Sequence, residues 1–310
     1  MVYAEPAFVM PPPPPDFERL RLTWHGADGS TWVLGSERDV HVLRDVVGML
    51  HPSFADEVSS SPAVHGQFYR SGRARPRALS IQALLWGATS RELVSRHREW
   101  WRSWSPYETG RLDVASLDGV RSIDLRLTPS GDAGLGVDPQ RFGWERAEVL
   151  AVADDPFWRG QPVERSWSTA PPAPFYGEGS GPPFYISQAS VIDGASIDNP
   201  GDEDTWPVWT VEATAPTTDV RLTVAGGVIE LPDMAAGEAI RVDTHPALGG
   251  SQRGSVVDGV FVSSEDDIDG LLSVYDARRL PAGERVPVGI AMTGAGSVSL
   301  SFTPRYWMAF

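Results

Sequence analysis

Short alternating apolar stretches, separated by turn residues, run through most of this 310-residue chain, and only one segment has a convincing helical period. Alternation with a period of two indicates half-buried strands, and turn residues at short spacing indicate that successive strands pair. The clearest pair lies near the end of the chain, where residues 286–292 and 298–302 alternate on either side of Gly294-Ala295-Gly296. The sequence therefore predicts a mainly β protein.

The first half of the chain predicts strands around a single helix. Hairpins and further strands are expected at residues 20–34, 40–46, 66–70, 77–86, 112–127 and 144–153. The helix is expected at residues 89–104, where Thr89 and Glu92 form a capping box and Pro106 follows the end. Its apolar face carries tryptophans at helical spacing, which is typical of a helix packed on a sheet.

The opposite face of this helix carries Arg91, Arg98 and Arg102. Arginines beside tryptophans could bind nucleic acid through phosphate contacts and base stacking. The interpretation we favour places the indoles against a sheet and the arginines in solvent or at a subunit contact. His97 lies among the apolar residues and is expected to be a hydrogen-bonded core histidine rather than a metal ligand.

The second half of the chain, after a segment rich in proline and glycine at residues 159–185, has strand patterns only. Asp193-Gly194 is expected to reverse the chain between two strands. Strands at this spacing without a helix predict a sandwich or jelly roll. Trp206, Trp209 and Tyr275 are candidate contacts for a sugar ring on this second domain, although core or hinge packing is the commoner use of such residues.

Composition excludes several classes of function. The net charge of -15 argues against a general binder of nucleic acid or anionic membranes, both of which need a basic surface. There is no cysteine, which excludes disulfides and thiolate metal sites, and all 26 basic residues are arginine. The N-terminus has no basic segment followed by an apolar one, so no secretory signal is expected, and Pro11 to Pro15 predict a stiff spacer. We expect a protein that is made in a cytoplasm and does not insert in a membrane.

No catalytic motif is present. The histidines lack metal-ligand spacing, no serine lies in a nucleophile elbow, and no phosphate-binding glycine loop or dinucleotide fingerprint occurs. The acidic runs at 202–204 and 265–269 lack the spacing of a calcium loop and are expected to be solvated. We therefore expect neither an enzyme nor a bound metal or cofactor. A carboxylate pair for glycoside hydrolysis stays an open alternative, because the separation of such a pair is a property of the fold.

Several stretches resemble siphophage distal tail proteins, the hexameric hub proteins of the tail tip. In the second half these are "IDNPGDEDTWPVWTVE", "IELPDMAAGEAIRVDT" and the closing "VSLSFTPRYWMAF". In the first half they are "WWRSWSPYETG", "RLDVASLDGVRSIDLRL" and the exit "VLAVADDPFW". The order and spacing of these stretches carry the resemblance more than any one of them.

The resemblance implies a domain organisation. Residues 1–158 are expected to form a sandwich-like or barrel-like ring domain with one helix. Residues 159–185 would be a linker or arm, and residues 186–310 a galectin-like or jelly-roll β-sandwich. The resemblance also allows the last strand, about residues 303–310, to pair back with the N-terminal domain.

The resemblance further implies a structural role in the virion. Such a protein forms a homohexameric ring at the end of the tail tube, with a channel for DNA. Its implied partners are copies of itself, the tail tube protein, the tape measure protein, and a tail-associated lysin, tail hub or fibre protein. In such a ring, Arg91, Arg98 and Arg102 are candidate subunit contacts. The alternative is a minor tail protein that binds or hydrolyses a carbohydrate of the host wall.

Overall fold

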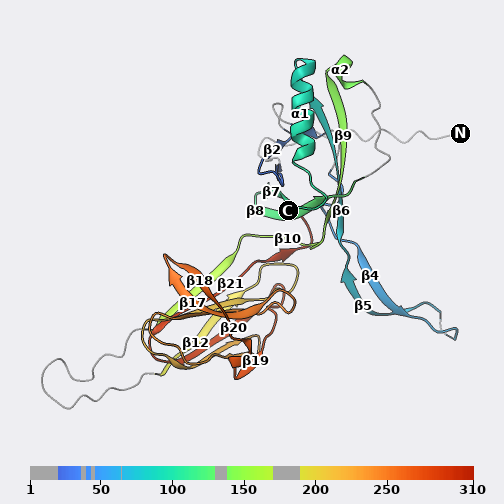
Figure 1. Cartoon of the computed structure of the whole chain (residues 1–310). Helices are drawn as coiled ribbons and strands as arrows, with labels where there is room; N and C mark the ends of the chain where they lie inside the picture. Colours follow the sequence, from blue (N-terminus) through green and yellow to red (C-terminus); the bar gives the residue numbers. More distant parts are fainter. Residues whose placement is uncertain (1–19, 36–39, 43–45, 64, 130–137, 170–188) are drawn as a thin grey trace, which may run out of the picture. The chain divides into compact units, whose positions relative to one another are not determined.

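The chain folds into two compact units. The computed structural model describes residues 20–35, 40–42, 46–63, 65–129, 138–169 and 189–310 (Figure 1). Unit 1 comprises Met1–Pro156 together with Ala309–Phe310, and unit 2 comprises Phe157–Met308. The chain therefore leaves unit 1 to build unit 2 and returns to unit 1 with its last residues.

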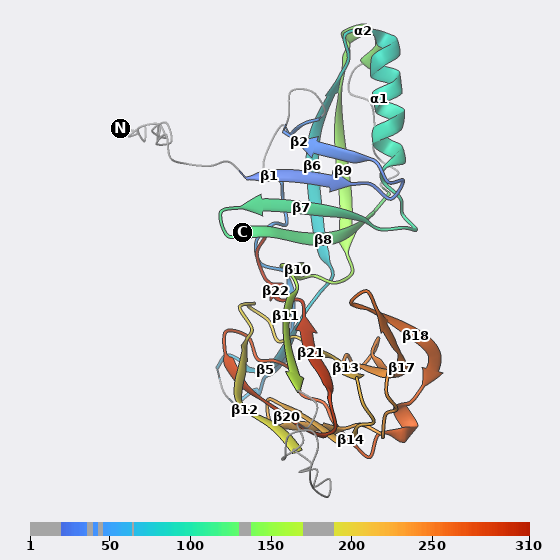
Figure 2. The same cartoon turned by 90° about the vertical axis from the view of Figure 1, so that its left-hand side faces the viewer.

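Seven strands of unit 1 form a sheet in the order β2-β1-β7-β8-β9-β6-β3 (Figure 2). They are β1 (Arg21–His25), β2 (Thr31–Leu34), β3 (His41–Val42), β6 (Arg77–Trp86), β7 (Gly110–Ser116), β8 (Gly119–Leu127) and β9 (Trp144–Ala153). Neighbours in this order are antiparallel. Alternate residues of β6 and β9 are buried, which confirms the half-buried pattern predicted from the sequence.

The two ends of this strand order meet. Leu34 at the end of β2 forms an isolated parallel bridge with Val40, immediately before β3. The sheet is therefore nearly closed and barrel-like, as the resemblance implied. Its buried side chains include Trp24, Leu79, Ile81, Leu85, Leu112, Val114, Ile123, Leu125 and Val149.

Helix α1 (Ser90–Arg102) packs on this sheet through tryptophans. The rings of Trp24 and Trp104 are stacked with centroids 3.7 Å apart, and Trp100 meets Trp32 edge to face at 5.4 Å. Aromatic pairs in these arrangements add stability beyond the area that they bury. The predicted helix with indoles against a sheet is confirmed.

The start of α1 follows the predicted capping box. The Thr89 hydroxyl accepts a hydrogen bond from the backbone N–H of Glu92 at 3.2 Å, and the Glu92 carboxylate accepts one from the backbone N–H of Ala88 at 3.0 Å. The first bond satisfies a donor that the helix start leaves open, and the second joins Glu92 to the residue before the N-cap rather than to the N-cap itself. The sequence did not predict α2 (Pro139–Phe142), because a single turn is too short to show a period.

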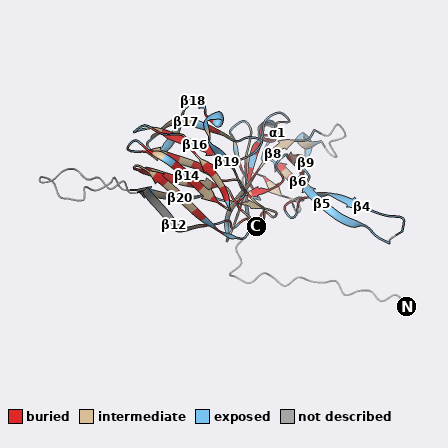
Figure 3. Ribbon diagram, turned by 90° about the horizontal axis from the view of Figure 1, so that it is seen from below, coloured by how far each residue is buried: buried red, intermediate tan, exposed pale blue. Residues whose placement is uncertain are grey.

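A separate two-stranded sheet in unit 1 is formed by the hairpin of β4 (Phe54–Ser59) and β5 (Phe68–Ala74). In the part of the chain that the structure describes, no third strand pairs with either of them. Most of its residues are exposed, as the pale blue of Figure 3 shows. A hairpin without a covering layer is only marginally stable in water.

Unit 2 is a β-sandwich of two antiparallel sheets, in the orders β11-β21-β13-β16-β17-β18 and β12-β20-β14-β15-β19. The first sheet contains β11 (Val163–Thr169), β13 (Val208–Ala213), β16 (Ala239–Asp243), β17 (Gly250–Val257), β18 (Val260–Asp267) and β21 (Gly296–Phe302). The second contains β12 (Ala189–Asp198), β14 (Thr218–Val224), β15 (Gly227–Glu230), β19 (Val274–Asp276) and β20 (Arg285–Thr293), and a 3-10 turn, η1 (Asp269–Leu271), precedes β19. The predicted sandwich is confirmed.

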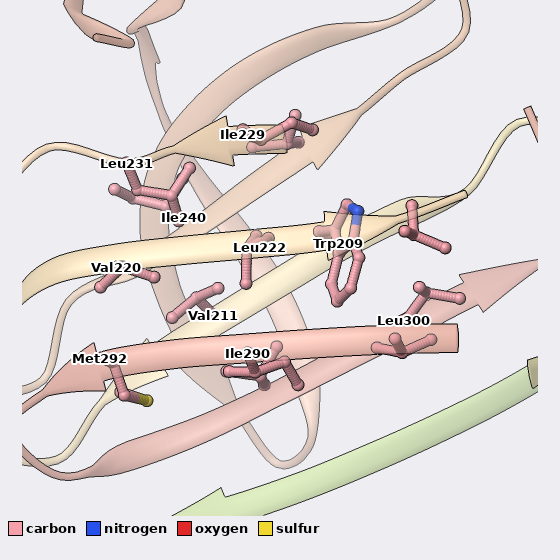
Figure 4. Packing of buried hydrophobic residues seen from close by; sticks show 14 of the residues in the cluster. Trp209, Val211, Val220, Leu222, Ile229, Leu231, Ile240, Ile290, Met292 and Leu300 are labelled. Carbon is pink, nitrogen blue, oxygen red and sulfur yellow. The ribbon is translucent and has the colours of Figure 1, made fainter. Parts of the chain in front are cut away.

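Both sheets contribute to one apolar core, in which Trp209, Leu222 and Leu300 come from β13, β14 and β21 (Figure 4). β20 and β21 have the predicted alternation, but they do not pair with each other. β20 pairs with β12 and β14, whereas β21 pairs with β11 and β13. The turn at Gly294, where φ is 135°, therefore carries the chain from one sheet to the other, and the predicted hairpin is wrong.

Two further expectations in unit 2 differ from the structure. Asp193-Gly194 does not reverse the chain, since β12 continues through it with a bulge between Ile192 and Ala195. Residues 163–169, which were assigned to a linker, form β11, while residues 170–188 lie outside the described residues.

The chain enters and leaves unit 2 on paired strands. β10 (Trp158–Arg159) is antiparallel to β22 (Arg305–Tyr306), with Trp158 opposite Tyr306. Three residues after Tyr306, the backbone N–H of Ala309 donates to the carbonyl of Met49 in unit 1 at 2.9 Å.

Candidate interaction surfaces

The outer face of α1 presents the arginines predicted from the sequence. Arg91, Arg98 and Arg102 are exposed, and their spacing of seven and four residues places them on one face of the helix. Arg102 acts on an acid of its own chain, Asp28. Burial acts to raise the pKa of the Asp28 carboxyl, but hydrogen bonds from Ser30 and the charge of Arg102 outweigh it, so the pKa lies below its usual value. Neither Arg91 nor Arg98 has an ion-pair partner among the described residues. Two guanidinium groups are thus free to meet an acid outside the chain.

His97 is held by an acid at the edge of this face. Its Nδ1 lies 2.5 Å from Oε2 of Glu145, whose side chain is buried. The bond fixes the imidazole and gives the buried carboxylate a partner. The expectation of a hydrogen-bonded histidine is confirmed, although the ring is half-buried rather than in the core.

The hairpin β4–β5 carries large apolar side chains that are exposed to solvent in part. Phe54, Val58, Phe68 and Tyr69 are 42%, 41%, 57% and 66% exposed. Val58 lies opposite Tyr69 in the strand register. The sequence predicted a strand at residues 66–70 but missed its partner β4. Apolar residues at both ends of β4 flank two adjacent acids, so the segment has no clear period of two.

The three aromatic candidates of unit 2 have different environments. Trp209 is fully buried in the core of the sandwich, so this candidate does not contact a sugar and the alternative of core packing holds for it. Trp206 is partly buried, and the Arg279 guanidinium lies 5.6 Å from the centre of its ring. Tyr275 on β19 is half exposed. Of the three candidates, Trp206 and Tyr275 therefore present aromatic surface to solvent.

The acids at 202–204 are used within unit 2. Oδ2 of Asp202 accepts from the backbone N–H of Trp307 at 3.1 Å, and Oε2 of Glu203 accepts from the indole of Trp307 at 3.2 Å. Within the described residues, no group of His, Asp and Glu could hold a metal ion. The helices that the structure describes include none that is long and apolar enough to cross a membrane.

Comparison with known structures finds this fold in a phage hub protein and in a phage baseplate. No protein-family model and no curated protein matches the sequence. The structure is similar to that of SPP1 Dit, described as a paradigm of the hub adsorption apparatus in Gram-positive-infecting phages. The TM-score is 0.63 at 14% identity, with 93% of this chain and 99% of that chain covered. It is also similar to a chain of the phage P2 baseplate in its activated conformation with Ca, with a TM-score of 0.51 at 11% identity over 93% of this chain and 98% of that chain. The chain therefore has a Dit-like fold over nearly its whole length.

Proposed function

We propose that this protein is a structural component of a phage tail tip. It forms a homohexameric ring that joins the tail tube to the hub or baseplate and leaves a channel for DNA. The observation that carries the proposal is the likeness to SPP1 Dit, which covers 93% of this chain and 99% of that chain. A likeness that spans both units is more specific than one to either β-rich unit alone, because single β-sandwiches serve many functions.

Two surfaces of unit 1 support subunit contacts. Arg91 and Arg98 lack acidic partners in a chain whose net charge is -15, so a neighbouring copy offers many carboxylates. Arginine makes charge-assisted, forked hydrogen bonds to carboxylates. The apolar residues of the hairpin β4–β5 need a cover, and a neighbouring subunit supplies one.

In this proposal, residues 1–158 form the ring. The partners are further copies of the chain, the tail tube protein, the tape measure protein, and a tail-associated lysin, tail hub or fibre protein. The protein is assembled in the host cytoplasm and lies at the tail tip of the virion. Its acidic charge suits a channel through which DNA passes without sticking. The role is structural and includes no catalysis.

The proposal is tested by the absolute mass of the purified protein from light scattering, over a series of concentrations and salt conditions. We expect a mass six times that of the 33.7 kDa chain, and a ring with an axial channel in electron micrographs. The measurement is made on two samples, the protein alone and the protein mixed with the tail tube protein encoded in the same genome. A chain that is monomeric in both samples contradicts the ring.

Charge reversal on α1 tests the contact surface. Arg91→Glu combined with Arg98→Glu is expected to lower the fraction of hexamer, most strongly at low salt, because screening weakens exposed charge pairs. The control combines Arg221→Glu with Arg285→Glu, which makes the same change of charge on exposed arginines of unit 2. If both variants form rings as the unchanged protein does, α1 is not the contact.

A further inference from the structure

A small polar pocket in unit 2 has a chemistry that the proposed ring does not use. Its volume is about 170 Å³. The lining residues come from β16, β17 and the loop between them, and they are Arg241, Asp243, Leu248, Gly249, Gly250 and Gln252.

The register of β16 and β17 brings the polar side chains together. Arg241 lies opposite Gln252, and Asp243 lies opposite Gly250. Residues that are opposite in an antiparallel pair, or two apart along a strand, point to the same face of the sheet. Val242, between the two polar residues of β16, is fully buried in the core. The polar face is therefore the outer face of the sandwich.

The pocket exists because Gly250 has no side chain. A Cβ added to Gly250 would have only one atom within 4 Å, Oδ2 of Asp269 at 3.8 Å. Oδ1 of Asp269 accepts from the backbone N–H of Ser251 at 2.6 Å, which fixes the carboxylate at this edge and leaves Oδ2 toward the space. Leu248, which is 84% exposed, stands at the rim.

The polar groups of the pocket keep free hydrogen-bonding capacity. Arg241 and Gln252 are exposed, and neither side chain has a hydrogen bond or ion pair with another described residue. Oδ1 of Asp243 accepts from the backbone N–H of His245 at 3.0 Å, which leaves Oδ2 available. The pocket thus offers donors on Arg241 and Gln252 and an acceptor on Asp243.

The charges of Asp243 and Asp269 also act on the hydroxyl of Tyr275. Burial raises the pKa of the Tyr275 hydroxyl, and the charges of Asp269 and Asp243 raise it further. The hydroxyl therefore stays protonated at neutral pH and can donate. Its ring is half exposed. Among the residues that line the pocket, Leu248 supplies the apolar surface beside the polar groups.

The mixture of positive and negative side chains at the pocket disfavours the binding of a small anion or a metal cation. The carboxylates of Asp243 and Asp269 repel phosphate, and the guanidinium of Arg241 repels a divalent cation. A sugar hydroxyl both donates and accepts, so it can use guanidinium, amide and carboxylate groups at once. The C–H face of a sugar ring can pack on Leu248.

We propose that the pocket of Arg241, Asp243, Gly250 and Gln252 binds one neutral sugar residue of a glycan. This activity is independent of the ring, because none of these residues belongs to the proposed subunit contacts of unit 1. It adds recognition of a carbohydrate surface to a structural protein.

Saturation-transfer NMR with the full chain tests the proposal. The probes are glucose, galactose, rhamnose and N-acetylglucosamine at up to about 20 mM, which covers the weak millimolar range of small single-sugar sites. Gly250→Leu places a side chain in the pocket, and Arg241→Ala removes its main donor. The matched controls are Gly289→Leu on β20, where an added Cβ makes ordinary contacts at 3.5 Å, and Arg221→Ala on β14.

We expect at least one of the four sugars to bind the unchanged protein and both controls equally. Binding to Gly250→Leu and Arg241→Ala should be at least about tenfold weaker, which corresponds to the loss of one or two hydrogen bonds. Absence of binding for all four sugars overturns the proposal, as does undiminished binding to Gly250→Leu. Inorganic phosphate that displaces the bound sugar in the same assay would show an anion site instead. The mass of the same samples reports separately on the ring.

Discussion

At the scale of single residues, Arg77 shows how one side chain holds several backbone segments. It is 2% exposed, and its guanidinium donates to the carbonyls of Pro156 at 2.7 Å, Gly48 at 2.6 Å and also Leu50. Burial lowers the pKa of Arg77 to about 10, so the group still carries its charge at neutral pH. Charge-assisted bonds of this kind satisfy carbonyls that have left the regular ladder.

Arg77→Met should therefore lower the free energy of unfolding of unit 1 by about 2–4 kcal/mol, because it leaves buried carbonyls unpaired. Urea unfolding followed by tryptophan fluorescence measures this change. The control Arg146→Met removes an exposed arginine that bonds only to Gln82 among the described residues, and should change stability by less than about 0.5 kcal/mol. Equal effects of the two substitutions would show that the buried bonds contribute nothing.

At the scale of elements, the hairpin β4–β5 exposes apolar side chains that a neighbouring subunit can cover. Phe68→Ser combined with Tyr69→Ser should reduce hexamer formation in sedimentation or light-scattering experiments, since it removes apolar surface that a neighbour covers. The melting temperature of the monomeric form should stay nearly unchanged, because both side chains are already exposed. A large loss of monomer stability would mean that the hairpin is covered within its own chain.

Local sequence patterns predicted the elements better than their partners. The alternation in β20 and β21 was readable, and so was the capping box of Thr89 and Glu92, because both depend on neighbours in sequence. The sheet to which each strand belongs depends on packing between distant segments, which no local pattern records. Trp209 illustrates the same limit, because the local sequence of an indole two residues after a proline does not show whether the indole is buried or exposed.

The polar pocket of unit 2 was missed for a related reason. Arg241 lies between buried residues of one strand, Gln252 lies in a separate and mostly half-buried strand, and neither strand alone indicates a site. Only the register between β16 and β17 places the two side chains opposite each other. Arg91, Arg98 and Arg102 could be read directly, because a single helix sets their common face.

At the scale of the whole molecule, unit 1 is completed by the end of the chain. Ala309 is fully buried, and its N–H donates to Met49. Deletion of Ala309 and Phe310 should lower the unfolding temperature of unit 1 by several degrees, which is the effect of about 1–2 kcal/mol in a domain of this size. Unit 2 should be unaffected, since it has its own core.

Calorimetry of the full chain, the shortened chain and residues 157–308 alone separates the two transitions. The transition that residues 157–308 give in isolation identifies unit 2, and only the other one should move. A shift of both transitions would mean that the stability of each unit depends on the other.

The pairing of β10 with β22 has a consequence for the evolution of genes of this kind. The stretch between Arg159 and Arg305 starts and ends on adjacent strands, whose backbones are about 4.8 Å apart in any sheet. Recombination at two short coding sequences can therefore replace this whole stretch by any module with similarly spaced ends, while the path of the chain through unit 1 is kept. A lineage can exchange one half of the molecule as a cassette and inherit the other half unchanged.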